Sequence, residues 1–169
     1  MTSGKSDQAS AILVVDGAVE NPLRLGYHDL AGLPAEDQIP DVSPHHPGRQ
    51  GSAVDLRALL RRSVPRREAR FLTLHADRDD FHVSIPLDAI RDRGMLVYRL
   101  GDGPLESAQG GPIRLLIRDP ASCHTAELDD CANVKYLSRI ELTSGRGRDT
   151  RPEDEQAHAD LHERQNLAT

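Results

Sequence analysis

The chain has 169 residues, of which 37% are hydrophobic and 28% charged, and its formal net charge is −6. This length and composition predict one globular domain that needs no metal or disulfide to complete its core. The acidic balance, the lack of a basic block and an aromatic content of only 3% argue against a nucleic-acid-binding surface.

Residues 1–10 are polar and predict a disordered N-terminus without the apolar core of a signal peptide. No later apolar run is long enough to cross a bilayer, so no membrane association is expected and the cytoplasm is the expected compartment. In a reducing compartment Cys123 and Cys131 are expected as thiols. A zinc site that uses Cys123, His124 and Cys131, and a disulfide between the two cysteines that closes the loop, are the alternatives.

Hydrophobic patterning predicts short strands that alternate with short helices. The segments 71–75 and 81–85 are expected to form a hairpin around the turn at 77–80. This arrangement favours an α+β domain over residues 11–143 rather than a doubly wound fold, with a polar, charged tail over 144–169. Strands are expected over 11–15, 71–75, 81–85, 95–100, 113–117 and 134–142, and helices from Tyr27, over 53–61 and over 87–91.

Two basic residues stand inside apolar, β-prone runs. Gly110-Gly-Pro predicts a turn, after which Ile113, Leu115 and Ile117 share one strand face while Arg114 lies on the other. Lys135, one of two lysines in the chain, follows in the next apolar run. Arg114 could grip a phosphate or carboxylate with its planar guanidinium, or could reach the surface and pair with an acidic neighbour.

Other chemical signals are weaker. No Gly-x-Ser-x-Gly elbow and no phosphate-cradling glycine loop is present. His75 and His82 lie on opposite arms of the predicted hairpin and are expected to be packed surface residues. His45 and His46, in the proline-containing loop 38–52, are expected to be a solvent-exposed pair.

Several segments in order along the chain match the landmarks of one known family. The chain from Ala11 to Leu142 resembles the oxidoreductase molybdopterin-binding domain, the catalytic module of the sulfite oxidase superfamily. Gly110–Ile117 is similar to its "h-G-x-P-v-R-l-v-v-P" strand, and Val134–Ile140 to its "v-K-w-l-x-x-I" strand. Further similar segments lie at residues 15–23, 29–34, 51–60, 84–87 and 96–105.

The resemblance implies a sulfite-oxidase-type fold of mixed β-sheets with short helices, and a pocket for the pterin of the molybdenum cofactor. It implies that Arg114 and Lys135 hold the terminal phosphate of molybdopterin, with Gln109 and Gly111 in the same pocket. The implied chemistry is that of an oxidoreductase that transfers oxygen atoms at molybdenum. In the family, a cysteine thiolate from the loop before the 51–60 segment completes the metal's coordination.

The chain departs from this family pattern at the metal. The loop 41–50 contains no cysteine, Gln109 replaces the histidine of the "h-G-x-P" motif, and the segment that precedes the first strand in larger members has no counterpart. Ser43, His45 or His46 from the same loop, or Cys123 from another side, are candidate replacement ligands. Two hypotheses follow: a small molybdenum-cofactor-dependent oxidoreductase, or a degenerate, non-catalytic module that binds a pterin or another small anion.

Overall fold

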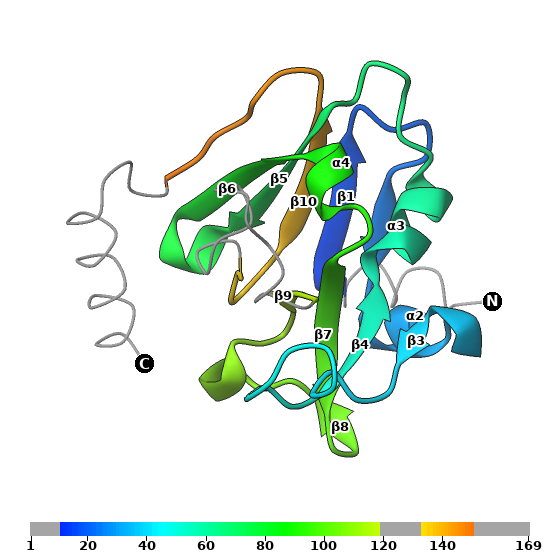
Figure 1. Ribbon diagram of the computed structural model, residues 1–169, viewed down its shortest axis with the longest axis vertical. Helices are drawn as coiled ribbons and strands as arrows, with labels where there is room; N and C mark the ends of the chain where they lie inside the picture. Colours follow the sequence, from blue (N-terminus) through cyan, green and yellow to red (C-terminus); the bar gives the residue numbers. More distant parts are fainter. Residues whose placement is uncertain (1–10, 119–132, 151–169) are drawn as a thin grey trace.

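The computed structural model describes residues 11–118 and 133–150, which form two β-sheets joined by short helical segments (Figure 1). This is the α+β class predicted from the sequence. The prediction for residues 1–10 and most of the predicted tail lie outside the described residues, so the division into domain and tail stays a prediction. No described helix has the length and apolar character needed to cross a membrane.

The first sheet has the strand order β2-β1-β10-β5-β6. Strands β1 and β10 pair in parallel, with Val15 opposite Ile140, whereas the other neighbours are antiparallel. The predicted hairpin is confirmed, and it places His75 directly opposite His82. The strands are β1 (Leu13–Gly17), β2 (Leu23–Leu25), β5 (Phe71–Ala76), β6 (Phe81–Pro86) and β10 (Arg139–Thr143).

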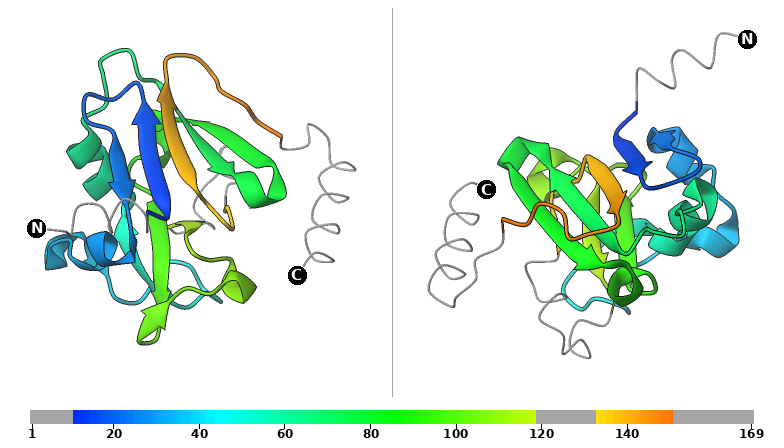
Figure 2. Two further views of the ribbon diagram at one scale, coloured as in Figure 1. Left: turned by 180° about the vertical axis from the view of Figure 1, so that it is seen from behind. Right: turned by 90° about the horizontal axis from the view of Figure 1, so that it is seen from above.

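The second sheet has the order β3-β4-β7-β8, and β9 also pairs with β7. Figure 2 shows the fold from behind and from above. The strands are β3 (Gln38–Ile39), β4 (Ser52–Asp55), β7 (Gly94–Leu100), β8 (Gly103–Pro104) and β9 (Arg114–Ile117). The helical segments are α2 (Tyr27–Ala31), α3 (Leu56–Ser63) and α4 (Leu87–Ile90), with 3-10 turns η1 (Ala35–Asp37), η2 (Asp77–Asp79) and η3 (Ser107–Gln109).

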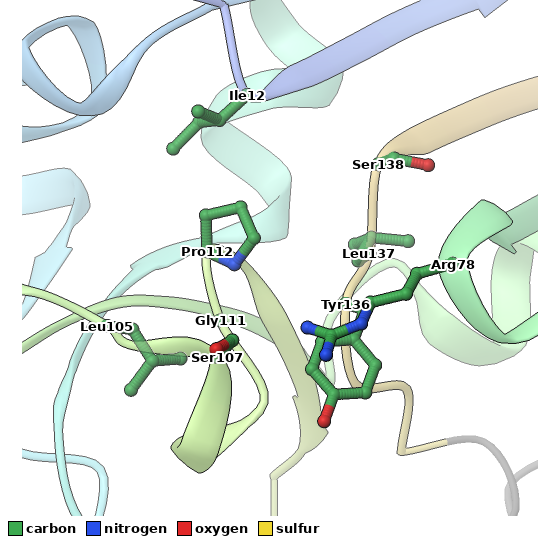
Figure 3. Close-up of a pocket in the computed structure, with 9 residues that line it drawn as sticks. All are labelled: Ile12, Arg78, Leu105, Ser107, Gly111, Pro112, Tyr136, Leu137 and Ser138. Carbon is green, nitrogen blue, oxygen red and sulfur yellow. The ribbon is translucent and has the colours of Figure 1, made fainter.

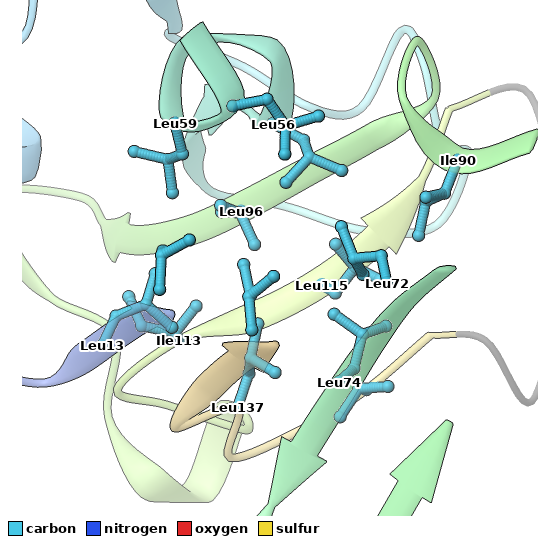
Figure 4. Packing of buried hydrophobic residues seen from close by; sticks show 14 of the residues in the cluster. Leu13, Leu56, Leu59, Leu72, Leu74, Ile90, Leu96, Ile113, Leu115 and Leu137 are labelled. Atoms are coloured by element: carbon cyan, nitrogen blue, oxygen red, sulfur yellow. The ribbon is translucent and has the colours of Figure 1, made fainter. Parts of the chain in front are cut away.

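The main core lies where side chains of the two sheets meet under α3 (Figure 4). Leu72 and Leu74 come from the first sheet, Leu115 from the second and Leu59 from the helix, and all four are fully buried. Leu116 points to the opposite face of β9, into a smaller cluster with Val97 and Leu105. The alternation predicted for 113–117 is therefore confirmed, and Arg114 shares the face of the smaller cluster.

The helix predicted from residue 53 begins later, because residues 52–55 pair with β7 as strand β4. Asp55 keeps an extended backbone and caps α3, since its carboxylate accepts the Arg57 N–H at 3.0 Å. The carboxylate also pairs with the guanidinium groups of Arg57 at 2.8 Å and Arg118 at 3.5 Å. The helical periodicity of Leu56, Leu59 and Leu60 misplaced this start, because it does not register the preceding strand pairing.

Replacing Asp55 with alanine should lower the free energy of unfolding by about 1–2 kcal/mol, the usual cost of losing an N-cap. Burial opposes ionisation of Asp55, but the bonds from Arg57 and the charge of Arg118 hold the pKa of its carboxyl below the usual value. The contribution of the ionised Asp55 carboxylate to stability is thus present at neutral pH and is lost as the pH falls into the acid range. Urea unfolding should show that the free energies of unfolding of wild type and Asp55→Ala differ less at pH ~3 than at pH ~7. An equal difference at both pH values would contradict the role of the ionised Asp55 as the N-cap of α3.

Candidate anion-binding site

The predicted Gly-Gly-Pro turn forms the floor of the candidate site. Gly110 ends η3 with a φ of 92°, a conformation that favours glycine. Gly111 packs so closely on the preceding chain that an added Cβ would lie 1.9 Å from the Leu105 carbonyl oxygen. The Gly111–Pro112 peptide bond is cis. The close packing of Gly111 on the backbone of Leu105 fixes the direction in which the chain enters β9.

Arg114 and Lys135 flank Gly110. A Cβ placed on Gly110 would lie 3.1 Å from Lys135 Cγ and 3.3 Å from Arg114 Cδ, so the two aliphatic stems run side by side. Lys135 is held there by its neighbours: the Val134 N–H donates to Leu115 O at 3.1 Å, and the Tyr136 N–H donates to Gly110 O at 2.8 Å. The two basic residues that stand out in the sequence are brought together.

The strand predicted from residue 134 is wrong in its first half, and the reason explains the position of Lys135. Val134 pairs with Leu115 in the second sheet, whereas Ile140 pairs with β1 in the first. The chain must therefore cross between sheets over residues 135–138, and Tyr136 adopts a φ of 57° in this crossing. Lys135 occupies the crossing rather than a regular strand.

Arg49, from the loop that precedes β4, adds a third cation. Its charge acts on both Arg114 and Lys135. Among the described residues, no ion pair joins any of these three cations to a carboxylate. Arg49 was missed in the sequence analysis, because an arginine in a loop of an arginine-rich chain carries no signal of where it points.

The guanidinium of Arg114 is incompletely bonded. Its Nη1 donates to Gln109 O at 3.4 Å, whereas its buried Nε has no hydrogen-bond partner in the described part of the chain. Burial, and then the charge of Arg49, lower the pKa of Arg114 to about 10. Burial, and then the charges of Arg114 and Arg49, lower the pKa of Lys135. With a pKa of about 10, Arg114 is still a cation at neutral pH, and an anion between it and Lys135 would relieve the repulsion between the two groups.

A cavity of about 410 Å³ opens beside these cations. Arg49, Arg114, Lys135 and Gln109 line it, together with apolar side chains that include Leu116. Of the residues that the resemblance assigns to the pterin pocket, only Gly111 lies outside this lining. The arrangement can hold an anionic group against three basic side chains. The roles of Arg114, Lys135, Gln109 and Gly111 in holding a cofactor stay predictions.

A second cavity of about 360 Å³ lies across the same turn (Figure 3). Gly111 and Tyr136 line it, and Leu105 lines both cavities. The Arg78 guanidinium lies over the Tyr136 ring, with its Cζ 4.4 Å from the ring centroid. The lining of this second cavity is otherwise largely apolar, with Ile12, Pro112 and Leu137. This second cavity extends the site along the turn without adding a carboxylate.

The candidate metal ligands are not gathered in the described residues, where no group of three or more histidine, cysteine or acidic side chains could hold a metal ion. His46 is buried, and its Nδ1–H donates to Ile117 O at 2.9 Å, so the expectation of an exposed histidine pair is wrong for this residue. His45 is half-buried on the same loop. Cys123 lies outside the described residues.

Residues 52–150 match the family described as the oxidoreductase molybdopterin binding domain. The match spans more than half of the chain and includes the Gly-Gly-Pro turn, Arg114 and Lys135. The chain belongs to this family. The matched region begins at residue 52, just beyond the loop 41–50, where the resemblance places the family's thiolate ligand.

The fold is similar to a crystal structure of the sulfane dehydrogenase SoxCD from Paracoccus pantotrophus, with a TM-score of 0.59 and 21% sequence identity. The similarity covers 83% of this chain and 39% of that chain. At this identity the likeness establishes the sulfite-oxidase-type molybdopterin-binding fold only. No functionally curated protein matches the chain significantly.

Proposed function

We propose that the 410 Å³ cavity binds molybdopterin through its terminal phosphate, with Arg114, Lys135 and Arg49 as the anion ligands. The observation that carries the proposal is the convergence of Arg114 and Lys135 beside Gly110 without a carboxylate partner in the described ranges. Buried cations are expected to be paired, and the bond-free Nε of Arg114 is the kind of donor that a phosphate oxygen satisfies.

The three cations would contribute differently to phosphate binding. The guanidinium of Arg114 is planar and can donate two parallel N–H bonds to one phosphate, whereas the ammonium of Lys135 acts as a compact charge. Arg49 is exposed, so it adds attraction from the rim rather than a buried bond. Gly110 has no side chain, which leaves the space in which the stems of Arg114 and Lys135 lie together. Its φ of 92° favours glycine at this position.

These residues fit the phosphate end of the cofactor, and the metal end has no matching ligand in the described part. When bound, the molybdenum cofactor supplies a metal for oxygen-atom transfer, which would make the protein an oxidoreductase. The loop 41–50 brings Arg49 to the cavity and contains no thiolate. This observation favours a second candidate function, a non-catalytic module that binds a pterin or another small phosphate-bearing anion.

Cofactor content of the full chain, produced in a host that makes the cofactor, tests both functions. Molybdenum by elemental analysis and pterin by the fluorescence of its oxidised form are measured separately. Stoichiometric pterin with molybdenum supports the oxidoreductase, and pterin without molybdenum supports the non-catalytic module. Absence of pterin overturns the proposal. An Arg114→Met, Lys135→Met double variant should lose the pterin, whereas Arg24→Met, in the other sheet, should keep it.

A further inference from the structure

The outer face of the first sheet, opposite the core, carries buried polar side chains. Leu74 points into the core from β5, so its neighbours Thr73 and His75 point to the other face. His75 is only 8% exposed and its partner His82 only 4%, which corrects the expectation of surface histidines. The reason is the segment 144–150, which leaves β10 and passes over β5 and β6 (orange in Figure 1).

The two histidines form the centre of a continuous row of hydrogen bonds. His75 Nδ1 lies 2.7 Å from His82 Nδ1. The outer nitrogens of both rings face carboxylates: His75 Nε2 lies 2.9 Å from Glu141 Oε1, and His82 Nε2 lies 2.9 Å from Asp80 Oδ1. No ring nitrogen of the pair is left without a partner.

Counting protons in this row shows that two neutral rings cannot make all three contacts. An ionised carboxylate only accepts, so each outer nitrogen must carry a proton. The central contact needs one more proton, because two lone pairs facing each other at 2.7 Å repel. With both carboxylates ionised, the three contacts together require three protons on two imidazoles, one more than the neutral rings carry.

The charges around the pair favour that extra proton. Glu141 from β10 and Asp80 from the η2 turn lie at its two ends. Beyond them, Arg139 pairs with Glu141 at 3.5 Å and Arg148 with Asp80 at 3.2 Å. The hydrogen bond from His82, and then the charge of Arg148, lower the pKa of the Asp80 carboxyl, so that this end of the row is ionised.

The remaining polar neighbours leave the pair itself untouched. Asp77 accepts from Ser138 Oγ at 2.9 Å, and Asp149 from the segment over β6 accepts from the Ser84 N–H at 3.2 Å. In the described part of the chain, the ring nitrogens of the pair contact only each other, Glu141 and Asp80.

The backbone of His82 bonds residues 146–150 to the sheet edge. The Thr150 N–H donates to His82 O at 2.8 Å, and the His82 N–H donates to Thr150 Oγ1 at 2.9 Å. Three residues earlier in the segment, the Gly147 N–H donates to Ser84 Oγ at 2.9 Å. Strand β6 is the edge of its sheet, so these bonds cover backbone groups that would otherwise be open to another strand.

We propose that His75 and His82 share one extra proton and that this proton fastens residues 146–150 onto the edge strand β6. Removing it leaves one of the three contacts of the row without a proton. Where that contact is the one between His82 Nε2 and Asp80, Asp80 loses the partner that holds it next to Arg148. Because the proton is bound in the fastened form, the segment is held at lower pH and released as the pH rises. The proposal is independent of what the basic cavity binds.

The protonation state is tested directly by nitrogen NMR of the imidazole rings in the full chain at pH ~7. In wild type, the spectrum should show either one doubly protonated ring and one neutral ring, or two rings with averaged signals that correspond to one extra proton shared between them. The exposed His28 serves as the reference histidine in the same spectra. Two neutral rings would overturn the proposal.

Fastening is tested by amide hydrogen exchange at Thr150, corrected for the intrinsic rate at each pH. Protection of Thr150 in wild type should fall at least ~10-fold between about pH 6 and about pH 9, while Leu74 in the β5–β10 ladder keeps its protection. His82→Gln should show the low Thr150 protection at both values, and His28→Gln should behave as wild type. Should His82→Gln unfold, the wild-type profile decides: Thr150 protection that stays constant while the rings lose their charge overturns the proposal.

Discussion

Replacing Arg114 with methionine is expected to weaken phosphate binding and, at the same time, to stabilise the ligand-free protein. The two effects have opposite signs because the native cavity holds an unpaired positive charge. The buried Nε of Arg114 has no hydrogen-bond partner in the described ranges, and the charges of Arg49 and Lys135 lie next to it. A methionine of similar length fills the space without either cost.

The magnitudes follow from the bonds that change. A hydrogen bond between charged groups contributes about 1.5–3 kcal/mol, so inorganic phosphate should bind about 10- to 150-fold more weakly to Arg114→Met. Leaving a buried donor unbonded costs about 1–3 kcal/mol, so the free energy of unfolding without ligand should rise by about 1 kcal/mol. Thermal unfolding with and without phosphate measures both quantities, because a ligand that binds only the native state raises the midpoint.

Arg24→Met is the matched control for this substitution. Arg24 is exposed on β2 and does not line the cavity. It should leave both the ligand-free midpoint and its shift with phosphate unchanged. If Arg114→Met instead lowers the ligand-free stability and phosphate stabilises the variant as much as it stabilises wild type, Arg114 is a structural residue and phosphate does not bind to it.

Features of this site that depend on local sequence were predictable. Side chains alternate between the two faces of a strand, so the apolar pattern of residues 113–117 was enough to place Arg114 on the face opposite to that of Ile113. The Gly110–Pro112 turn and the β5–β6 hairpin follow from turn residues between β-prone runs. The family resemblance then connected Arg114 with Lys135 at one phosphate, and the two stems do lie together at Gly110.

Features that depend on contacts between distant segments were not predictable. Lys135 sits in a crossing between sheets because Val134 and Ile140 pair with different sheets, which the run of β-prone residues does not reveal. Burial of His75 and His82 requires the segment 144–150, whose composition predicts only a polar tail. Hydrophobic periodicity records which residues avoid water, and it carries no information about which polar segments cover one another.

Replacing Gly111 with alanine is expected to lower the free energy of unfolding by about 3 kcal/mol or more, beyond the usual range for overpacking. An added Cβ would lie 1.9 Å from the Leu105 carbonyl oxygen and 2.9 Å from the Glu106 carbonyl oxygen. Both are backbone atoms, so no rotation of a side chain relieves the clash. The Gly111 N–H donates to the same Glu106 oxygen at 2.9 Å, so moving the chain apart also breaks this bond.

Gly103→Ala is the control in the neighbouring β7–β8 hairpin, because nothing lies within 4 Å of a Cβ added there. Urea unfolding should show a change below about 0.5 kcal/mol for Gly103→Ala, as for other uncrowded surface sites. Similar midpoints for the two variants would show that the turn can relax and does not fix the direction of β9. The turn positions Arg114 and, through the Tyr136 N–H on Gly110, also Lys135. Any folded Gly111→Ala protein should therefore lose phosphate binding along with stability, a coupling that only a rigid turn beneath the two cations produces.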